Sequence, residues 1–399
     1  MGWKTLPAQN LPYSLDNLDK KKVEIPFEYE NHFIIIKLRF NNFLNTRFIF
    51  DTGAEHTIIT KKDILKFLPY QYVREIKIVG ADLSQTLKAH LIAGMNFTTG
   101  NLGATYQPVL VLEEDYFRFE EYTGLQIHGI LGANIFRNFV VQIDYKRKVI
   151  TLTKPNLFTP PGKNFKKVPI KIHKNKPYLA VDLKMNRDSQ PIPAKLLLDT
   201  GASLALMLHN NSHPSIKLPE MVVKGNIGKG LGGYLEGYLG RTQEIAFSGF
   251  EMQEVLTNFQ ELSGNIDSNL IYSRNGILGN KILERFEVIL DYQHEIAYMR
   301  PNNNYKAPFE FDKSGLVIVA GGANLNQFTI QSVVANSPAA EAGLKDGDTI
   351  TNINGWPVWL YSLENISSRL SKKEGNKVRL TIRRDDQKHK YKFVLRRLI

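Results

Sequence analysis

The arrangement of hydrophobic and polar residues along the chain predicts a protein built mainly from β-strands. Short apolar runs such as "FIF" (48–50) and "LLL" (196–198) alternate with polar or glycine-containing segments. Near the C terminus, "KVRLTIRR" (377–384) alternates apolar and basic residues, which is typical of a half-buried strand. Tyr and Phe are frequent and turn-forming residues are spread along the chain, as expected for β structure. No apolar run of about eighteen residues occurs, so no transmembrane helix is predicted.

The first three hundred residues contain an internal repeat. The segment "VEIPFEYENHFIIIKLRFN" from Val23 corresponds to "VPIKIHKNKPYLAVDLKMN" from Val168. An Asp-Thr-Gly triplet at Asp51 recurs at Asp199, an offset of 148 residues (199 minus 51). "GILGANIFRNFVVQIDY" (129–145) recurs as "GILGNKILERFEVILDY" (276–292), an offset of 147. Two copies are too few and too long for a solenoid, so the repeat predicts two similar lobes.

The repeat also sets the expected domain boundaries. In each lobe we expect an opening hairpin, an apolar strand ending in Asp-Thr-Gly, further hairpins, the "GILG" element with a short helix, and a closing hairpin. The Pro- and Lys-rich segment "NLFTPPGKNFKK" between the lobes is typical of a linker. The expected parts are an N-terminal extension (1–22), a first lobe (23–155), a linker (156–164), a second lobe (165–304) and a separate domain (308–399).

The positive charge is concentrated at the C-terminal end. The chain has 51 basic and 39 acidic residues, a net charge of +12. Residues 369–399 contain twelve Lys or Arg and three Asp or Glu, which gives +9 and leaves +3 for the rest. Such a patch would suit nucleic acid or an anionic membrane surface. Because apolar and basic residues alternate here, we favour a solvated hairpin and expect no nucleic-acid partner and no membrane span.

The absence of cysteine excludes some classes of chemistry, and the first residues concern the compartment of the protein. The chain has no cysteine, which rules out thiol catalysis, disulfides and thiolate metal sites. The opening "MGWKTLPAQNLPYSL" lacks the apolar segment of a signal peptide. The sequence fits a cytoplasmic protein, or a periplasmic or secreted one whose leader was removed.

The doubled triplet has a chemical interpretation. An apolar strand delivers Asp51 to a buried position, where a carboxylate needs hydrogen-bond donors. Gly53 permits a tight turn whose backbone N–H groups reach that carboxylate. If two such loops meet, Asp51 and Asp199 lie side by side and share one proton, since both cannot ionise cheaply. The pair then acts as acid and base at once and can hydrolyse an amide without a nucleophilic residue, metal or cofactor.

The doubled Asp-Thr-Gly-Ala, each followed 77 or 78 residues later by "GILG", resembles the aspartic peptidases. "DTGAEHT" and "GILGANIF" resemble the retropepsin-like branch in particular, over about 23–304. The resemblance implies two all-β lobes related by a pseudo-twofold axis and an endopeptidase acting on an extended polypeptide. Retroviral enzymes form the site by dimerisation, whereas this chain carries both lobes, so a monomer is sufficient.

The resemblance assigns roles to individual residues. Asp51 and Asp199 would be catalytic. The residues that would support the two catalytic loops are Thr52, Gly53, Ala54, Thr200, Gly201 and Ala202. Glu55 would bind backbone N–H groups of the substrate, and its counterpart Ser203 makes the two halves of the cleft chemically different.

Two hairpins are candidates for a flap over the substrate. They cover 77–92 in the first lobe and the glycine-rich 225–240 in the second, where Gly232 and Gly233 would contact substrate. The sequence leaves open which flap dominates, and which aspartate carries the proton.

Other repeated or conspicuous residues have simpler interpretations. Asp144 and Asp291 also repeat, but each precedes a predicted hairpin turn and is expected to stabilise that turn. His56 and His209 have no partners at metal-ligand spacing, and we expect them at the surface. "GNIGKG" (225–230) lacks the closing Ser or Thr of a phosphate-binding loop.

The C-terminal segment follows a different pattern. In "SPAAEAGLKDGDTITNINGWPV" (337–358), Ser337 and Pro338 predict the start of a short helix, and "NING" predicts a hairpin turn. The string resembles bacterial PDZ domains over about 308–399, which implies a β sandwich or barrel with two helices. The loop with Ser314, Gly315, Leu316 and Val317 would bind a C-terminal peptide carboxylate, and 362–370 would form the other wall of the groove. Alternatively, the domain only packs on the two lobes.

The preferred interpretation is a single-chain aspartic endopeptidase with a C-terminal PDZ domain. The alternative is a non-catalytic scaffold that binds peptides in the cleft and the PDZ groove. A basic nucleic-acid binder would rest on the C-terminal charge alone.

The residue after each triplet leads to a prediction about pH. Ala54 and Ala202 stand where pepsins usually have a hydroxyl residue, and loss of a donor to a carboxylate raises its pKa. We therefore expect a less acidic pH optimum than that of pepsin. A pH–rate profile of peptide cleavage that peaks near pH 2 would contradict this expectation.

Overall fold

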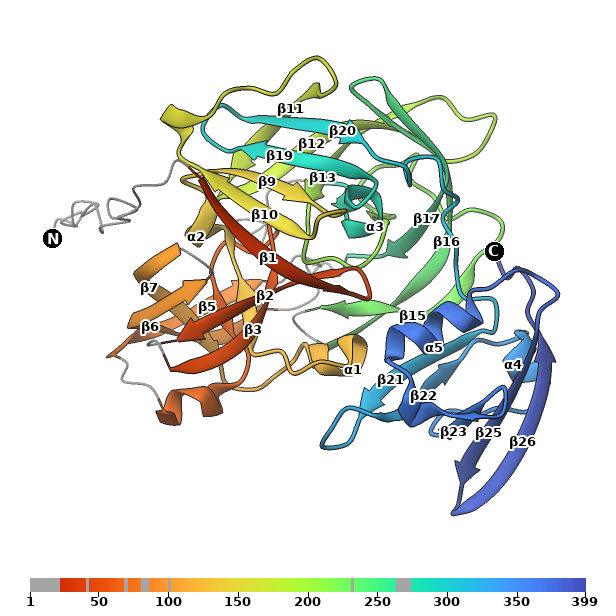
Figure 1. Ribbon diagram of the computed structural model, residues 1–399. Helices are drawn as coiled ribbons and strands as arrows, with labels where there is room; N and C mark the ends of the chain where they lie inside the picture. The colour runs from red at the N-terminus through yellow and green to blue at the C-terminus, as the bar shows by residue number, and fades with distance from the viewer. Residues whose placement is uncertain are drawn as a thin grey trace, which may run out of the picture.

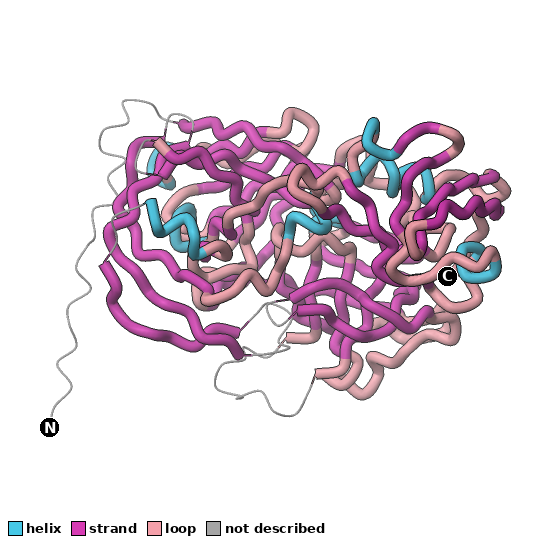
Figure 2. Tube along the Cα trace, turned by 90° about the horizontal axis from the view of Figure 1, so that it is seen from below, coloured by secondary structure: helices cyan, strands magenta, loops and turns pink. Residues whose placement is uncertain are grey.

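The computed structural model describes residues 22–40, 43–67, 71–79, 86–99, 102–230, 233–262 and 274–399. Two strand-rich lobes lie side by side, and the C-terminal domain lies at one end of them (Figure 1). A second view shows that the helices are few and short and that strands form most of both lobes (Figure 2). The predicted all-β lobes and C-terminal PDZ domain are confirmed.

The elements of the first lobe follow the expected order. They are β1 (Lys22–Glu30), β2 (Phe33–Phe40), β3 (Leu44–Phe50), β4 (Ile58–Ile59), η2 (Lys62–Phe67), β5 (Gln71–Val79), β6 (Thr86–Thr99), β7 (Leu102–Leu112), α1 (Phe119–Thr123), β8 (Gly129–Leu131), α2 (Ala133–Phe136), β9 (Val140–Asp144) and β10 (Val149–Thr153), followed by η3 (Pro155–Leu157).

The second lobe repeats this order, but η2 and α1 have no counterparts among its described residues. Its elements are β11 (Lys166–His173), β12 (Lys176–Lys184), β13 (Ile192–Leu198), β14 (Leu206–His209), β15 (Val223–Gly230), β16 (Gly233–Phe247), β17 (Phe250–Gln260), β18 (Gly276–Leu278), α3 (Asn280–Leu283), β19 (Phe286–Asp291) and β20 (Ile296–Pro301).

The pairing of strands repeats as the sequence does. In the first lobe β3 runs parallel to β8, with Phe48 opposite Gly129; in the second β13 runs parallel to β18, with Leu196 opposite Gly276. β4 pairs with β7 and β8, and β14 pairs with β17 and β18, in the same directions. Each lobe therefore holds the strand that ends in Asp-Thr-Gly against the strand that contains "GIL".

One antiparallel sheet joins the lobes. Its order is β1–β10–β9–β19–β20–β11, and the two lobes meet where β9 pairs with β19. Alternate residues of the central strands, such as Val141 and Leu290, are fully buried in a core that contains residues of both lobes. This shared core fixes the two Asp-Thr-Gly loops relative to each other, since neither lobe moves without disturbing close-packed side chains.

The C-terminal domain has its own hydrophobic core. It contains β21 (Leu316–Gly321), β22 (Gln327–Val333), α4 (Pro338–Glu341), β23 (Thr349–Ile353), β24 (Trp356–Pro357), η5 (Val358–Leu360), α5 (Leu363–Leu370), β25 (Lys377–Arg384) and β26 (Gln387–Val394). As predicted, Ser337 caps α4 by accepting a hydrogen bond from the Ala340 N–H, and Asn354-Gly355 forms a turn with positive φ angles.

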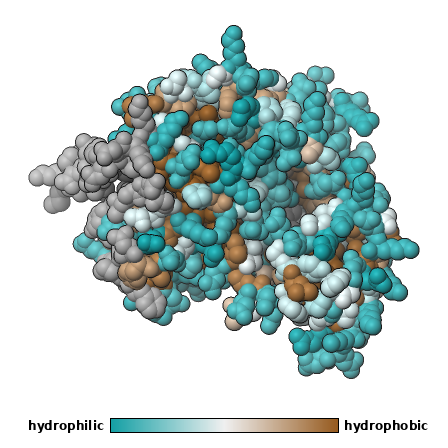
Figure 3. Space-filling model, viewed as in Figure 1, coloured by the Kyte–Doolittle hydropathy of each residue, from teal (hydrophilic) through white to brown (hydrophobic). Residues whose placement is uncertain are grey.

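The basic C-terminal end is the predicted hairpin, β25–β26. Residues of β25 alternate between exposed and buried, so the basic side chains face solvent while Val378, Leu380 and Ile382 enter the core. The corresponding end of the molecule is hydrophilic in the space-filling view (Figure 3). Within the described parts of the chain, no helix is long and apolar enough to cross a membrane.

Candidate active site

The two Asp-Thr-Gly loops meet between the lobes. Asp51 follows β3 directly and Asp199 follows β13. The Asp51 N–H donates to the Leu131 carbonyl (3.1 Å), and the Asp199 N–H donates to the Leu278 carbonyl (3.0 Å). Both aspartates are buried, with 8% and 2% of their surface exposed. The "GILG" strands thus support the aspartates from beneath.

Each carboxylate accepts hydrogen bonds from its own loop. Oδ1 of Asp51 accepts from the N–H groups of Gly53 (2.6 Å) and Ala54 (3.0 Å), and Oδ1 of Asp199 accepts from the N–H of Gly201 (2.8 Å). The glycines also lie against the opposite aspartate. A Cβ atom at Gly53 would stand 2.4 Å from Asp199 Oδ2, and one at Gly201 would stand 2.3 Å from Asp51 Cγ. Only glycine allows this close approach of the two loops.

The environment of the pair favours one shared proton. Burial, followed by the charge of Asp199 and their mutual hydrogen bond, raises the pKa of Asp51 well above its usual range. Burial also raises the pKa of Asp199, while the hydrogen bond from Asp51, the Gly201 amide and the charges of Arg274 and Lys176 counteract part of that increase. Two buried carboxyl groups in contact cannot both ionise cheaply, so the pair holds one proton between them.

Thr52 and Thr200 brace the two loops reciprocally. The Thr52 N–H donates to Thr200 Oγ1 (3.0 Å), and the Thr200 N–H donates to Thr52 Oγ1 (3.1 Å). Each hydroxyl also donates across the interface: Thr52 to the Leu198 carbonyl (2.7 Å), and Thr200 to the Phe50 carbonyl (2.9 Å). Both threonines are fully buried, so the four hydrogen bonds satisfy groups that water cannot reach.

The two halves of the site differ in charge. Glu55 keeps about a third of its side chain exposed, and its Oε1 lies 3.6 Å from Nε2 of His56, whereas Ser203 is its neutral counterpart. Lys176, at the start of β12, is half-buried near Glu55 and Asp199, and burial lowers its pKa. Lys176 was not predicted as a site residue, because its hairpin has no motif that points to the dyad.

Each opening hairpin also contacts the short helix region of the other lobe, which was not predicted from the sequence. His32 Nδ1 lies 2.9 Å from Glu284 Oε2 after α3, and the Tyr29 hydroxyl contacts the same carboxylate. In the other half, Arg137 after α2 donates to the side chain of Asn175. Glu284 and Arg137 occupy equivalent places in the repeat, 147 residues apart (284 minus 137), so the repeat could have suggested a shared role.

Three further predictions concern single residues. Asp144 accepts hydrogen bonds from the N–H groups of Lys146 and Arg147, and Asp291 accepts from that of His294, as expected for turns. The expectation of a surface position for His209 was wrong.

His209 is fully buried because β14 lies between β17 and β18 in the interior of the second lobe. Burial lowers the pKa of His209 to about 3, so the ring is neutral at physiological pH. Neither ring nitrogen has a hydrogen-bond partner within the described parts of the chain.

The remaining predicted binding residues lie apart from the dyad or outside the described residues. Gly232 lies outside them, as do 80–85 of the first candidate flap, and Gly233 is the first residue of β16. Ser314, Gly315, Leu316 and Val317 lie at the start of β21 in the C-terminal domain, and the loop before β21 already has a hydrogen-bond acceptor in Asp312.

Comparisons with known proteins agree with this two-part architecture. Residues 36–135, which include Asp51 and the first "GILG", match a family model described as "Aspartyl protease". Residues 329–384 match a model described as "PDZ domain". The chain thus contains a segment that matches an aspartyl protease domain and, towards its C terminus, one that matches a PDZ domain.

One curated relative matches a short part of the chain. It is the "Probable CtpA-like serine protease" of Staphylococcus saprophyticus, 41% identical over 64 residues. The match covers 16% of this chain and only 13% of that relative's length. So short a match carries no information about the chemistry of the present site.

The threonine brace leads to a prediction about stability. Thr200→Val removes the hydroxyl and leaves the Thr52 N–H and the Phe50 carbonyl without a partner in a buried place. We expect the free energy of unfolding, measured with urea, to fall by about 1–3 kcal/mol. Thr200→Ser keeps the hydroxyl and serves as the control. A Thr200→Val protein as stable as the wild type would contradict the prediction.

The position of Lys176 leads to a prediction about the pH dependence of activity. Its charge lowers the pKa of Asp199, so Lys176→Met should raise the pKa of the acidic limb of the kcat/KM profile. The neighbouring Lys174→Met is the matched control, because Lys174 is exposed and is not among the main causes of the pKa shift of either aspartate. An acidic limb that stays in place in the Lys176 variant would contradict the prediction.

Proposed function

We propose that this protein is a single-chain aspartic endopeptidase. The observation that carries the proposal is the pair of buried carboxyl groups, Asp51 and Asp199, in contact on equivalent loops. Such a pair supplies a base for water and an acid for a carbonyl oxygen within one hydrogen-bonded unit.

The chemistry follows from the shared proton. The ionised carboxylate takes a proton from the water as the water oxygen attacks the scissile carbonyl carbon. The protonated carboxyl gives its proton to the carbonyl oxygen, which produces a tetrahedral gem-diol. A proton then passes to the amide nitrogen, the carbon–nitrogen bond breaks, and a hydroxyl proton of the diol returns to the pair. The products are a carboxylic acid and an amine, and the dyad again holds one proton.

The substrate class follows from the position of the site. A polypeptide in extended form would lie between the lobes and over the dyad. Glu55 would accept hydrogen bonds from its backbone N–H groups, and one of the two candidate flaps (77–92 or 225–240) would cover it. Ala54 and Ala202 would contact the same chain at the edges of the two loops. Because Glu55 and Ser203 differ, one half of the cleft binds peptide N–H groups with a charge and the other with a neutral hydroxyl.

A monomer would be sufficient for this activity, since both aspartates come from one chain. The PDZ domain would act in recognition or regulation. The competing function is a scaffold that binds peptides in the same cleft without cleaving them, and the experiment below separates the two.

The proposal predicts the effect of removing either carboxylate. Asp51→Asn and Asp199→Asn each leave a pair that cannot act as acid and base at once, so cleavage of an unfolded protein substrate should fall by about 10³-fold or more. The control is Asp144→Asn, the same substitution at a repeated aspartate that stabilises a turn. Unchanged cleavage in both dyad variants would exclude the aspartic mechanism, and no cleavage by the wild type would favour the scaffold.

A further inference from the structure

The loop that would bind a peptide carboxylate already contains a carboxylate of this chain. Oδ1 of Asp312 accepts hydrogen bonds from the N–H groups of Ser314 (2.9 Å), Gly315 (2.6 Å) and Leu316 (3.2 Å), and from the Ser314 hydroxyl (2.7 Å). These are the backbone donors that a terminal carboxylate would need. Burial raises the pKa of Asp312 to about 6, so at neutral pH the side chain is ionised. An incoming carboxylate would meet a like charge and occupied donors.

The edge of the sheet that would accept a peptide strand is also covered. Among the described residues β21 pairs only with β22, so it is the edge strand of the C-terminal sheet, and α5 lies against it. The short helix α1 of the first lobe lies against both β21 and α5 (Figure 1). The Tyr122 hydroxyl lies 3.5 Å from Gln331 Oε1 on β22, and a Cβ atom at Gly124 would stand 3.7 Å from Cβ of Leu363 on α5. A peptide cannot pair with β21 unless α1 moves.

The first lobe holds α1 in this place. The Asn31 side chain donates to the Tyr122 carbonyl (2.5 Å), and Lys61 forms an ion pair with Glu120. Phe119 and Tyr122 pack on a cluster of the first lobe that contains Phe33, Ile35, Ile49 and Ile127. The first lobe therefore holds α1 in place through hydrogen bonds, an ion pair and apolar packing.

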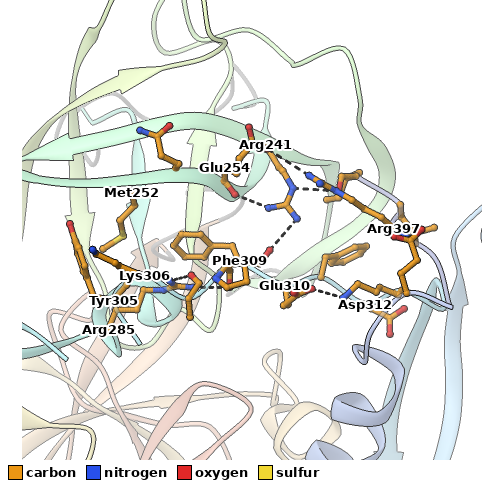
Figure 4. A pocket seen from close by; sticks show the side chains of 18 of the residues that line it. Arg241, Met252, Glu254, Arg285, Tyr305, Lys306, Phe309, Glu310, Asp312 and Arg397 are labelled. Carbon is orange, nitrogen blue, oxygen red and sulfur yellow. Dashed lines mark hydrogen bonds and ion pairs between the residues drawn. The ribbon is translucent and has the colours of Figure 1, made fainter. Parts of the chain in front are cut away.

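A second linker, residues 302–315 between β20 and β21, holds the C-terminal domain against the second lobe. The Arg285 guanidinium donates to the carbonyls of Asn304, Tyr305, Ala307 and Pro308 and lies 3.6 Å from the centre of the Phe309 ring. Arg241 donates to the carbonyls of Phe309 (3.0 Å) and Glu254 (2.7 Å). Figure 4 shows the two arginines converging on this stretch of the linker, beside a cavity of about 580 Å³. The linker is thus pinned to the second lobe, which limits how far the domain can swing away.

We propose that the PDZ groove is an intramolecular docking site for the Phe119–Gly124 segment of the first lobe, closed to peptide C termini in the resting protein. The inference rests on the interface alone and does not depend on the proposed peptidase activity. A peptide that enters the groove must displace both Asp312 from the loop and α1 from β21. The displaced segment ends five residues before β8, the strand that pairs with β3 beneath Asp51. Occupation of the groove would therefore disturb the element that supports one catalytic aspartate.

The first test traps the docked state with a disulfide. The chain has no cysteine, so Gly124→Cys together with Leu363→Cys introduces one defined pair. Its Cβ separation lies within the usual range of about 3.5–4.5 Å for disulfides. The control is Gly124→Cys with Lys390→Cys, because Lys390 lies on β26 at the opposite edge of the sheet. Under mild oxidation we expect peptide mapping to find an intramolecular disulfide in most molecules of the first variant and in few of the second. Equal rates of closure in the two variants would overturn the proposal.

The second test measures access to the groove and does not depend on the cysteine variants. The probe is a fluorescein-labelled pool of random heptapeptides with free C-terminal carboxylates, and the control is the same pool with C-terminal amides. Both are titrated by fluorescence anisotropy on the full-length Asp51→Asn protein, so that cleavage does not consume them. We expect equal binding of the two pools, because neither reaches the loop. Preferential binding of the carboxylate pool would show an open groove and overturn the proposal.

Discussion

Two carboxyl groups in contact inside a protein are the constraint on which the rest of this structure depends. A buried, unpaired carboxylate costs several kcal/mol, and a second one beside it adds repulsion. The fold offsets this cost with backbone N–H donors from each loop, and with glycines at positions 53 and 201, where any side chain would collide with the opposite aspartate. The threonine brace and the interlobe sheet then prevent the loops from separating.

The same constraint explains why the lobes share a core instead of meeting through a polar interface. Motions between domains are common when their interface is small and polar. Here β9 pairs with β19, and the side chains of both lobes pack in one cluster. The loops that carry Asp51 and Asp199 are thus positioned by a core that both lobes share. The position of the C-terminal domain is also restricted, since arginine side chains bind the segment between β20 and β21 and the PDZ groove lies against α1.

The sequence was sufficient for the features that depend on local patterns. The repeat predicted the two lobes, the triplets predicted loops that bring Asp51 and Asp199 to one place, and Ser337-Pro338 predicted the start of α4. It was insufficient for contacts between segments far apart in the chain. Nothing local distinguishes Lys176 from a solvated lysine, or Asp312 from an ordinary loop residue. His209 was expected at the surface because it has no partner at metal-ligand spacing, but its burial depends on two neighbouring strands that no local pattern places beside it.

The central claim is that one chain forms one site from two different loops. It is tested most directly by mixing the inactive Asp51→Asn and Asp199→Asn proteins in equal amounts, with and without a mild denaturation and refolding step, and measuring cleavage of an unfolded protein substrate. If each site forms within one chain, no mixture contains an intact pair, and the account predicts no recovery of activity over either variant alone. Recovery of activity on mixing would show that lobes pair between chains, and would contradict the account.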